Sequence, residues 1–169
     1  FHPTAKSVWE NCQGTITDKP SSKADWANAV NNQGNPATGR LVFESLNAQC
    51  QTCHQVNGWG GTFGPGLSNI GSSKSKELLI NAILNPSQEM APEWQGWFVV
   101  DKEGNTHYGR QIDVHLNKVE LMNTDGSFAT YGQAQSFGVS EKSLMPEGLE
   151  QTMTKEEFND LIAYLTSLQ

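Results

Sequence analysis

Apolar residues recur at helical spacing along much of the chain, and the pattern is clearest at the C-terminal end. There Thr154 and Glu157 have the spacing of a capping box, in which each side chain bonds to the backbone of the other residue. The apolar stripe that follows comprises Phe158, Leu161, Ile162, Leu165 and Leu168. Tyr164 lies near this stripe, and we expect it to meet Phe43 where two helices cross.

Three shorter stretches also have helical periodicity. They predict helices over 22–30, 38–50 and 73–84. The helix over 38–50 is expected to run without a break into Cys50 and so to place that residue on a rigid element. Asn85 and Pro86 end the third stretch, because a residue before proline disfavours the helical conformation.

Residues 96–136 have a different pattern, typical of short strands separated by turns. Turn-forming residues occur at 101–104 and at 123–126. The strand-like segments are 96–100, 105–112, 117–122 and 127–136. They predict a small antiparallel meander of three or four strands. The fold class expected from the whole pattern is therefore mainly α, with a small antiparallel β insertion at about 96–136.

The length of 169 residues suits one domain, or one domain with an appendage. Residues 1–22 are polar and interrupted by proline and glycine, so we expect an extended lead-in or the tail of a removed upstream segment. Residues 23–169 form the predicted domain. A hydrophobic content of 36% with 16 glycines indicates a compact, loop-rich fold.

The segment 50–54 carries the clearest chemical signal: Cys50 and Cys53 are three positions apart, and His54 follows directly. This spacing is typical of covalent haem attachment, in which the thiols bind one porphyrin and the histidine supplies the proximal imidazole. A zinc site needs about four ligands, and the remaining candidates are Cys12 and scattered histidines. A thioredoxin-like dithiol needs a βαβ pattern, which does not precede Cys50. We therefore predict one haem c held through Cys50 and Cys53.

A proline and a methionine complete the predicted site. The carbonyl of Pro65 is placed to accept a hydrogen bond from the second nitrogen of His54, which would orient the imidazole. Met145, which is followed by a stiffening proline, is the leading candidate for the sixth ligand. Met90, a histidine or an open position are the alternatives. The predicted metal ligands are thus His54 and Met145.

Several other residues have weaker predicted roles. Trp59 and Trp97 either line the haem pocket or belong to the core, and Arg40 and Arg110 are candidate partners of the haem propionates. We expect His107 and His115 to be surface or strand residues and not ligands, and we expect His2, near the N-terminal end, to have no role in the site. Met122 and Met153 are expected to be structural.

Net charge and composition limit the partners and the cellular location that we expect for this protein. The net charge of −7 argues against nucleic acid and anionic membranes as partners, and no apolar run reaches the length of a membrane span. Haem c is attached outside the cytoplasm, so we expect a periplasmic or secreted protein. Cys12 is left over, and a free thiol is favoured over a disulfide.

The motifs taken in order resemble a class I-type bacterial cytochrome c. They are Cys50-x-x-Cys53-His54, Gly64-Pro65-x-Leu67, Asn85-Pro86-Ser87, a strand insertion, Met145-Pro146 and a terminal Leu-x-x-Tyr-Leu helix. More narrowly, residues 26–168 resemble the C-terminal haem-binding domain of large secreted proteins from planctomycete-like bacteria. The resemblance implies cytochrome c-like helices around one covalent haem, with His54 and Met145 as axial ligands.

The function expected from these features is single-electron transfer between extracytoplasmic redox partners, such as a dehydrogenase, an oxidase or another cytochrome. The protein is expected not to be an enzyme, and a further expectation is that it is fused to or cleaved from a larger protein. The alternatives are a haem-based sensor or enzyme with an open distal site, and a recognition module that uses the β insertion.

Overall fold

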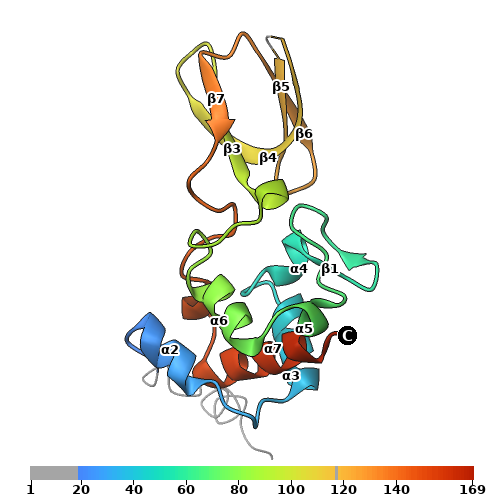
Figure 1. The fold of residues 1–169 in the computed structure, drawn as a ribbon, viewed down its shortest axis with the longest axis vertical. Coiled ribbons are helices and arrows are strands. Elements are labelled where there is room, and N and C mark those ends of the chain that lie inside the picture. The colour runs from blue at the N-terminus through green and yellow to red at the C-terminus, as the bar shows by residue number, and fades with distance from the viewer. Residues whose placement is uncertain (1–18, 117) are drawn as a thin grey trace, which may run out of the picture.

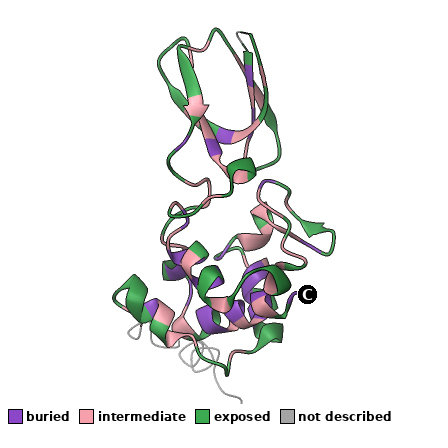
Figure 2. Cartoon of the chain, in the orientation of Figure 1, coloured by how far each residue is buried: buried purple, intermediate pink, exposed green. Residues whose placement is uncertain are grey.

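The α-helices lie at one end of the molecule and the five-stranded sheet lies at the other (Figure 1). The computed structural model describes residues 19–116 and 118–169. The predictions for His2 and Cys12, and most of the predicted lead-in, lie outside these residues. Buried side chains are concentrated in the helical end, and a smaller set lies in the sheet (Figure 2).

Six α-helices and two 3-10 helices occur among the described residues. They are α2 (Lys23–Ala29), α3 (Pro36–Glu44), α4 (Cys50–Cys53), α5 (Ile70–Ser73), α6 (Lys76–Leu84), η2 (Pro92–Trp94), η3 (Leu149–Thr152) and α7 (Lys155–Ser167). The predicted capping box is confirmed, because the Thr154 and Glu157 side chains each bond to the other residue's backbone N–H. Ser22 likewise caps α2 by accepting from the Asp25 N–H.

Helices α3 and α7 pack against each other at the centre of the helical end. The rings of Phe43 and Tyr164 lie 5.6 Å apart between centroids, which confirms the predicted contact. Gly39 lets the two backbones approach closely, because a Cβ at this position would overlap the carbonyl of Asp160 and come within 2.8 Å of the Tyr164 Cβ. This crossing fixes the position of the chain that leads to Cys50.

The prediction of one continuous helix over 38–50 is wrong. Helix α3 ends at Glu44, and the backbone N–H of Ala48 bonds instead to the Ser45 hydroxyl. A serine side chain that bonds to the nearby backbone competes with helical hydrogen bonding. Gln49 is left-handed, with φ 55°, so α4 starts as a separate element, and Leu46 lies 88% exposed in between.

The strand region forms an antiparallel sheet with the order β6-β5-β4-β3-β7. Its strands are β3 (Gly96–Val100), β4 (Thr106–His115), β5 (Lys118–Met122), β6 (Phe128–Gly132) and β7 (Ser136–Val139). The predicted single strand over 127–136 is divided because Gln133 is left-handed, with φ 56°, and the chain turns there. β7 then pairs with β3 at the far side of the sheet. A separate hairpin of β1 (Gln55–Val56) and β2 (Trp59–Gly60) follows α4.

The expected fold class, mainly α with a small β insertion, is wrong. Among the described residues 35% are helical, with 3-10 turns included, and 22% lie in strands. The physical reason is that the sheet has a core of its own, in which Val99, Val119 and Leu121 are fully buried. Because the five paired strands bury side chains of their own, the sheet is a second structural unit beside the helices, and the fold is of the α and β type.

A substitution at Gly39 tests the helix crossing. We expect Gly39→Ala to lower the free energy of unfolding by about 1–3 kcal/mol, because overpacking against the Asp160 backbone outweighs the gain in helix propensity. Chemical denaturation measures the change. Gly132→Ala is the control, since a Cβ there meets no atom within 4 Å. Equal effects of the two substitutions would contradict this account.

A second prediction concerns Asp101, in the turn between β3 and β4. Its carboxylate accepts hydrogen bonds from His107 Nε2 at 2.7 Å and from the Asn105 N–H at 2.8 Å, and the first of these is the main cause that lowers its pKa from 3.8 to about 2. The contribution to stability is therefore complete above pH 3.8 and is lost as the pH falls from about 3.8 to about 2. Unfolding followed between pH 5 and pH 2 should show a shallower acid loss in Asp101→Asn than in the wild type.

Candidate functional site

The two thiols of the motif lie on one helical turn. Cys50 and Cys53 are the first and last residues of α4, both are free, and both are half-buried. The backbone N–H of His54 bonds to the Cys50 carbonyl at 2.9 Å, and His54 itself is extended. The turn thus brings both sulfurs and the following imidazole into one small region of the molecule.

Both thiols are neutral in the polypeptide near pH 7. Burial raises the pKa of Cys50 to about 11 and also raises the pKa of Cys53. Cys50 Sγ lies 3.6 Å from the Ala48 carbonyl as a weak donor. Protonated thiols are poor ligands for a metal ion, because metal binding requires thiolates.

The imidazole of His54 is held by the predicted hydrogen bond. His54 Nδ1 lies 2.8 Å from the carbonyl oxygen of Pro65, which confirms the expected contact. A carbonyl can only accept, so Nδ1 carries the proton and Nε2 is left with its lone pair. Burial is the main cause that lowers the pKa of His54, and the bond to Pro65 opposes it in part. The neutral imidazole therefore presents Nε2 as a ligand atom.

The glycine-rich loop 58–66 is hydrogen-bonded to the backbone of α4, which we call the attachment helix because it carries Cys50 and Cys53. The N–H of Gly61 donates to the Gln51 carbonyl at 2.8 Å, and the N–H of Gly64 donates to the Cys53 carbonyl at 2.8 Å. These bonds satisfy carbonyls at the C-terminal end of a very short helix. The loop therefore holds α4 in place and carries Pro65 to His54.

Two glycines of this loop touch His54 itself. A Cβ at Gly64 would lie 2.7 Å from His54 Cε1, and a Cβ at Gly60 would overlap the His54 carbonyl. Gly60 also has a φ of 119°, which favours glycine. The structure shows that these glycines allow approach to the attachment helix and its histidine.

Met145 lies in a loop that serine side chains hold. The N–H of Met145 donates to the Ser143 hydroxyl at 3.1 Å, and the N–H of Ser143 donates to the Ser87 hydroxyl at 3.1 Å. Met145 is half-buried and packs against the helical core. In Figure 1 this loop and α4 both lie between the sheet and the crossing of α3 with α7. The ligand role of Met145 stays a prediction.

The remaining methionines and histidines that could be considered as iron ligands are distributed over the sheet and the helical end. Met122 is buried in β5 and Met153 in the helical core. His107 is bonded to Asp101 and lies 4.5 Å from the ring of Tyr131. His115 ends β4, and Met90 is half-buried between α6 and η2.

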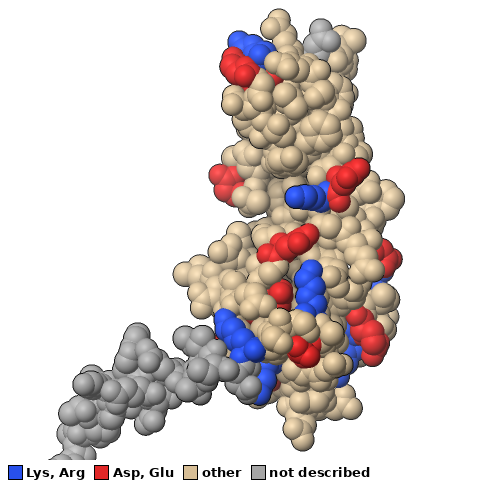
Figure 3. All heavy atoms as spheres, turned by 90° about the vertical axis from the view of Figure 1, so that its left-hand side faces the viewer, with Lys and Arg blue, Asp and Glu red and all other residues tan. Residues whose placement is uncertain are grey.

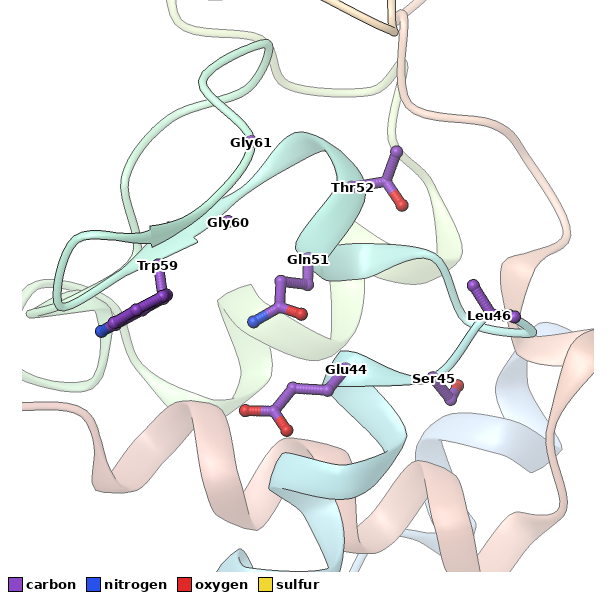
Figure 4. A pocket seen from close by; sticks show the side chains of 8 residues that line it. All are labelled: Glu44, Ser45, Leu46, Gln51, Thr52, Trp59, Gly60 and Gly61. Carbon is purple, nitrogen blue, oxygen red and sulfur yellow. The ribbon is translucent and has the colours of Figure 1, made fainter.

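A hollow of about 340 Å³ lies beside the attachment helix (Figure 4). Its lining residues are Glu44, Ser45, Leu46, Gln51, Thr52, Trp59, Gly60 and Gly61. Trp59 lies at the border of this hollow and is 78% exposed. Trp97 instead stacks on Phe137 within the sheet, with 6.4 Å between the ring centroids. Of the two tryptophans proposed for the pocket, the structure therefore places Trp59 near the attachment helix and Trp97 in the sheet.

The two arginines considered as propionate partners are engaged with the protein. Arg40 Nε lies 2.7 Å from the Glu44 carboxylate. Arg110 Nη1 donates to the Thr62 carbonyl at 2.8 Å, and its guanidinium lies 4.4 Å from the ring centroid of Trp94. Neither Arg110 contact is indicated by periodicity or by a motif, because both connect segments that are not neighbours along the chain.

These residues fit a covalently bound haem. Two neutral, half-exposed thiols on one turn precede an imidazole whose free nitrogen is Nε2, and a carbonyl fixes the orientation of the ring. Among the described residues no cluster of three or more histidine, cysteine, aspartate or glutamate side chains could hold a metal ion.

Comparison with known families gives the same assignment. Residues 36–111 match the model of the cytochrome c family, a segment that contains Cys50, Cys53, His54 and Pro65 and ends before Met145. No curated protein matches the chain. A cytochrome c-type haem-binding domain is therefore present, and its cofactor is haem c, covalently attached through Cys50 and Cys53. This domain supports a haem-based electron-transfer function.

The close contact of Gly64 with His54 gives a test of the site. We expect Gly64→Ala to displace the imidazole and to lower the free energy of unfolding by about 1–3 kcal/mol, since the neighbouring ring must move. Thermal or chemical unfolding measures this, and the proton resonances of His54 should shift. Gly66→Ala is the control, because its Cβ would meet only the Gln55 carbonyl, at 3.9 Å. A similar response of both variants would contradict the predicted role of Gly64.

Proposed function

We propose that this protein is a mono-haem electron carrier in which His54 and Met145 are the axial ligands. The observation that carries the proposal is the hydrogen bond from His54 Nδ1 to the Pro65 carbonyl, directly after two half-exposed thiols. It leaves Nε2 as the ligand atom and sets the direction of the ring. When bound, the haem supplies a one-electron couple of iron.

The chain's own residues account for an electron carrier better than for an enzyme. Cys50 and Cys53 hold the group covalently, and His54 supplies an oriented, neutral imidazole. Met145 would fill the remaining position, which excludes a substrate or gas from the iron and raises the potential relative to two nitrogen ligands. We therefore propose that the protein is not an enzyme. No contact in the described residues singles out the alternative with an open distal site.

The setting proposed for this carrier is outside the cytoplasm, in the periplasm or as a secreted protein. Covalent haem attachment takes place there. Within 19–116 and 118–169, no helix has the length and apolar character needed to cross a membrane. The narrower kinship proposed, with haem-binding domains of secreted planctomycete-like proteins, is consistent with this setting and with a fused or cleaved parent protein.

The partner proposed is another redox protein, such as a dehydrogenase, an oxidase or a second cytochrome. On the face drawn in Figure 3, acidic and basic side chains are interspersed over the helical end, and few charged side chains lie on the sheet. A surface of mixed charge favours a small and transient interface over strong steering by one sign of charge.

One observation favours a second role for the sheet, namely recognition of a partner or a polysaccharide. Tyr108 and Phe128 are each 60% exposed on its strands. Exposed aromatic rings are typical of binding surfaces. This role is compatible with electron transfer, because it would use the exposed strands and not the residues that hold the haem.

The ligand assignment is tested by removing each methionine candidate in turn. We expect Met145→Ala to abolish the weak far-red absorption band of a methionine–ferric iron bond and to lower the reduction potential, because a weaker-field or nitrogen ligand replaces the thioether. Met90→Ala is the matched control and should change neither property. Loss of the band in Met90→Ala, with Met145→Ala unchanged, would move the ligand to Met90.

A further inference from the structure

The five-stranded sheet contacts both the glycine-rich loop that orients His54 and the loop that carries Met145, and it does so through one pair of residues. Gly96 on β3 and Arg110 on β4 face each other across the antiparallel ladder at the base of the sheet. Arg110 reaches the glycine-rich loop that holds His54, and Gly96 packs against the loop that holds Met145. Neither contact is needed to form the sheet itself.

The contact on the histidine side runs through Thr62. Arg110 Nη1 donates to the Thr62 carbonyl at 2.8 Å, and Thr62 lies between Gly61 and Gly64, whose N–H groups bond to the attachment helix. Pro65, the acceptor of His54 Nδ1, follows directly. The arginine therefore holds the middle of the short segment that orients the imidazole.

The guanidinium of Arg110 is itself fixed from the other side. It lies over the ring of Trp94, 4.4 Å from the centroid, and Trp94 belongs to η2, just before β3. A planar guanidinium that stacks on an aromatic ring while it donates from one edge has little freedom to move. This makes the bond to Thr62 a rigid connection between the sheet and the loop.

The contact on the methionine side is made by the backbone of Gly96. The Gly96 carbonyl accepts the Ser140 N–H at 2.7 Å, which joins the two ends of the inserted region. A Cβ at Gly96 would come within 2.8 Å of Leu144 Cγ, so the side chain next to Met145 rests directly on this glycine. A shift of β3 would therefore displace Leu144, which is the neighbour of Met145 in the chain.

We propose that the base of the inserted sheet, at the Gly96–Arg110 pair, braces both ligand loops and that Arg110 is a positioning residue for His54. The part that concerns Met145 rests on the function proposed above, whereas the part that concerns His54 depends on the CxxCH histidine alone. The sheet would then limit the movement of the two loops that lie next to the haem ligands. A partner that binds the sheet would therefore contact an element that is joined to the loops next to both proposed iron ligands.

The first test removes the arginine bridge in the haem-loaded protein. In Arg110→Gln we expect the amide protons of Gly61 and Gly64 to exchange about threefold to tenfold faster, because a charge-assisted hydrogen bond no longer holds the loop. The reduction potential should shift to a more positive value, since a weaker bond from His54 to Pro65 makes the imidazole less basic. Arg110→Lys, which keeps the charge and a donor, should recover part of both changes.

The control for charge is Lys102→Gln, which removes an equal charge from an exposed site near the turn between β3 and β4. If Arg110→Gln changes neither exchange nor potential more than Lys102→Gln does, the proposed brace is overturned. If Arg110→Gln does not fold, Trp94→Leu takes its place: it keeps the donor, removes the platform, and should speed exchange at Gly61 and Gly64 to a smaller extent. Unchanged exchange in that variant also overturns the proposal.

The methionine side is tested with Gly96→Ala, which pushes on Leu144. We expect faster exchange of the Met145 amide proton, which otherwise donates to the Ser143 hydroxyl. Gly138→Ala in β7 is the control, because its Cβ would make an ordinary contact with Phe98 at 3.4 Å. These amide measurements do not require Met145 to bind iron, so failure of the ligand assignment and failure of the brace give different results. Equal Met145 exchange in both variants overturns the second contact.

Discussion

The hydrogen bond between His54 Nδ1 and the Pro65 carbonyl is the constraint on which the site depends. It selects the tautomer that leaves Nε2 as the ligand atom, and it requires the intervening chain to fold back on α4 within eleven residues. That return is made by glycines, because Gly60 and Gly64 approach His54 more closely than any side chain would allow. The position of the site relative to the rest of the molecule follows from the packing of α3 on α7.

The sequence predicted local features well where a residue type has one dominant use. The capping box of α7, the contact of Phe43 with Tyr164 and the bond from His54 to Pro65 were all expected and are present. It was less informative where neighbouring groups compete. Ser45 takes the Ala48 N–H from the helix, and Gln49 and Gln133 adopt left-handed conformations that no glycine or asparagine marks.

Contacts between distant segments could not be predicted from periodicity. Arg110 was considered as a propionate partner, but its position opposite Gly96 and over Trp94 depends on how the sheet sits above the loop. The share of strand was underestimated for a related reason. Alternation shows that a strand exists, whereas the pairing of β7 with β3 and the burial of Val99 need the complete sheet.

The two ends of the strand region lie side by side, because β7 pairs with β3 and the Ser140 N–H donates to the Gly96 carbonyl. The sheet is therefore topologically a long loop whose entry and exit are adjacent, and the entropy of closing a loop grows only slowly with its length. A chain in which a tight turn replaces the residues between Gly96 and Ser140 could keep its helical framework. By the same reasoning, this junction would accept a longer insertion at a small additional cost in loop-closure entropy.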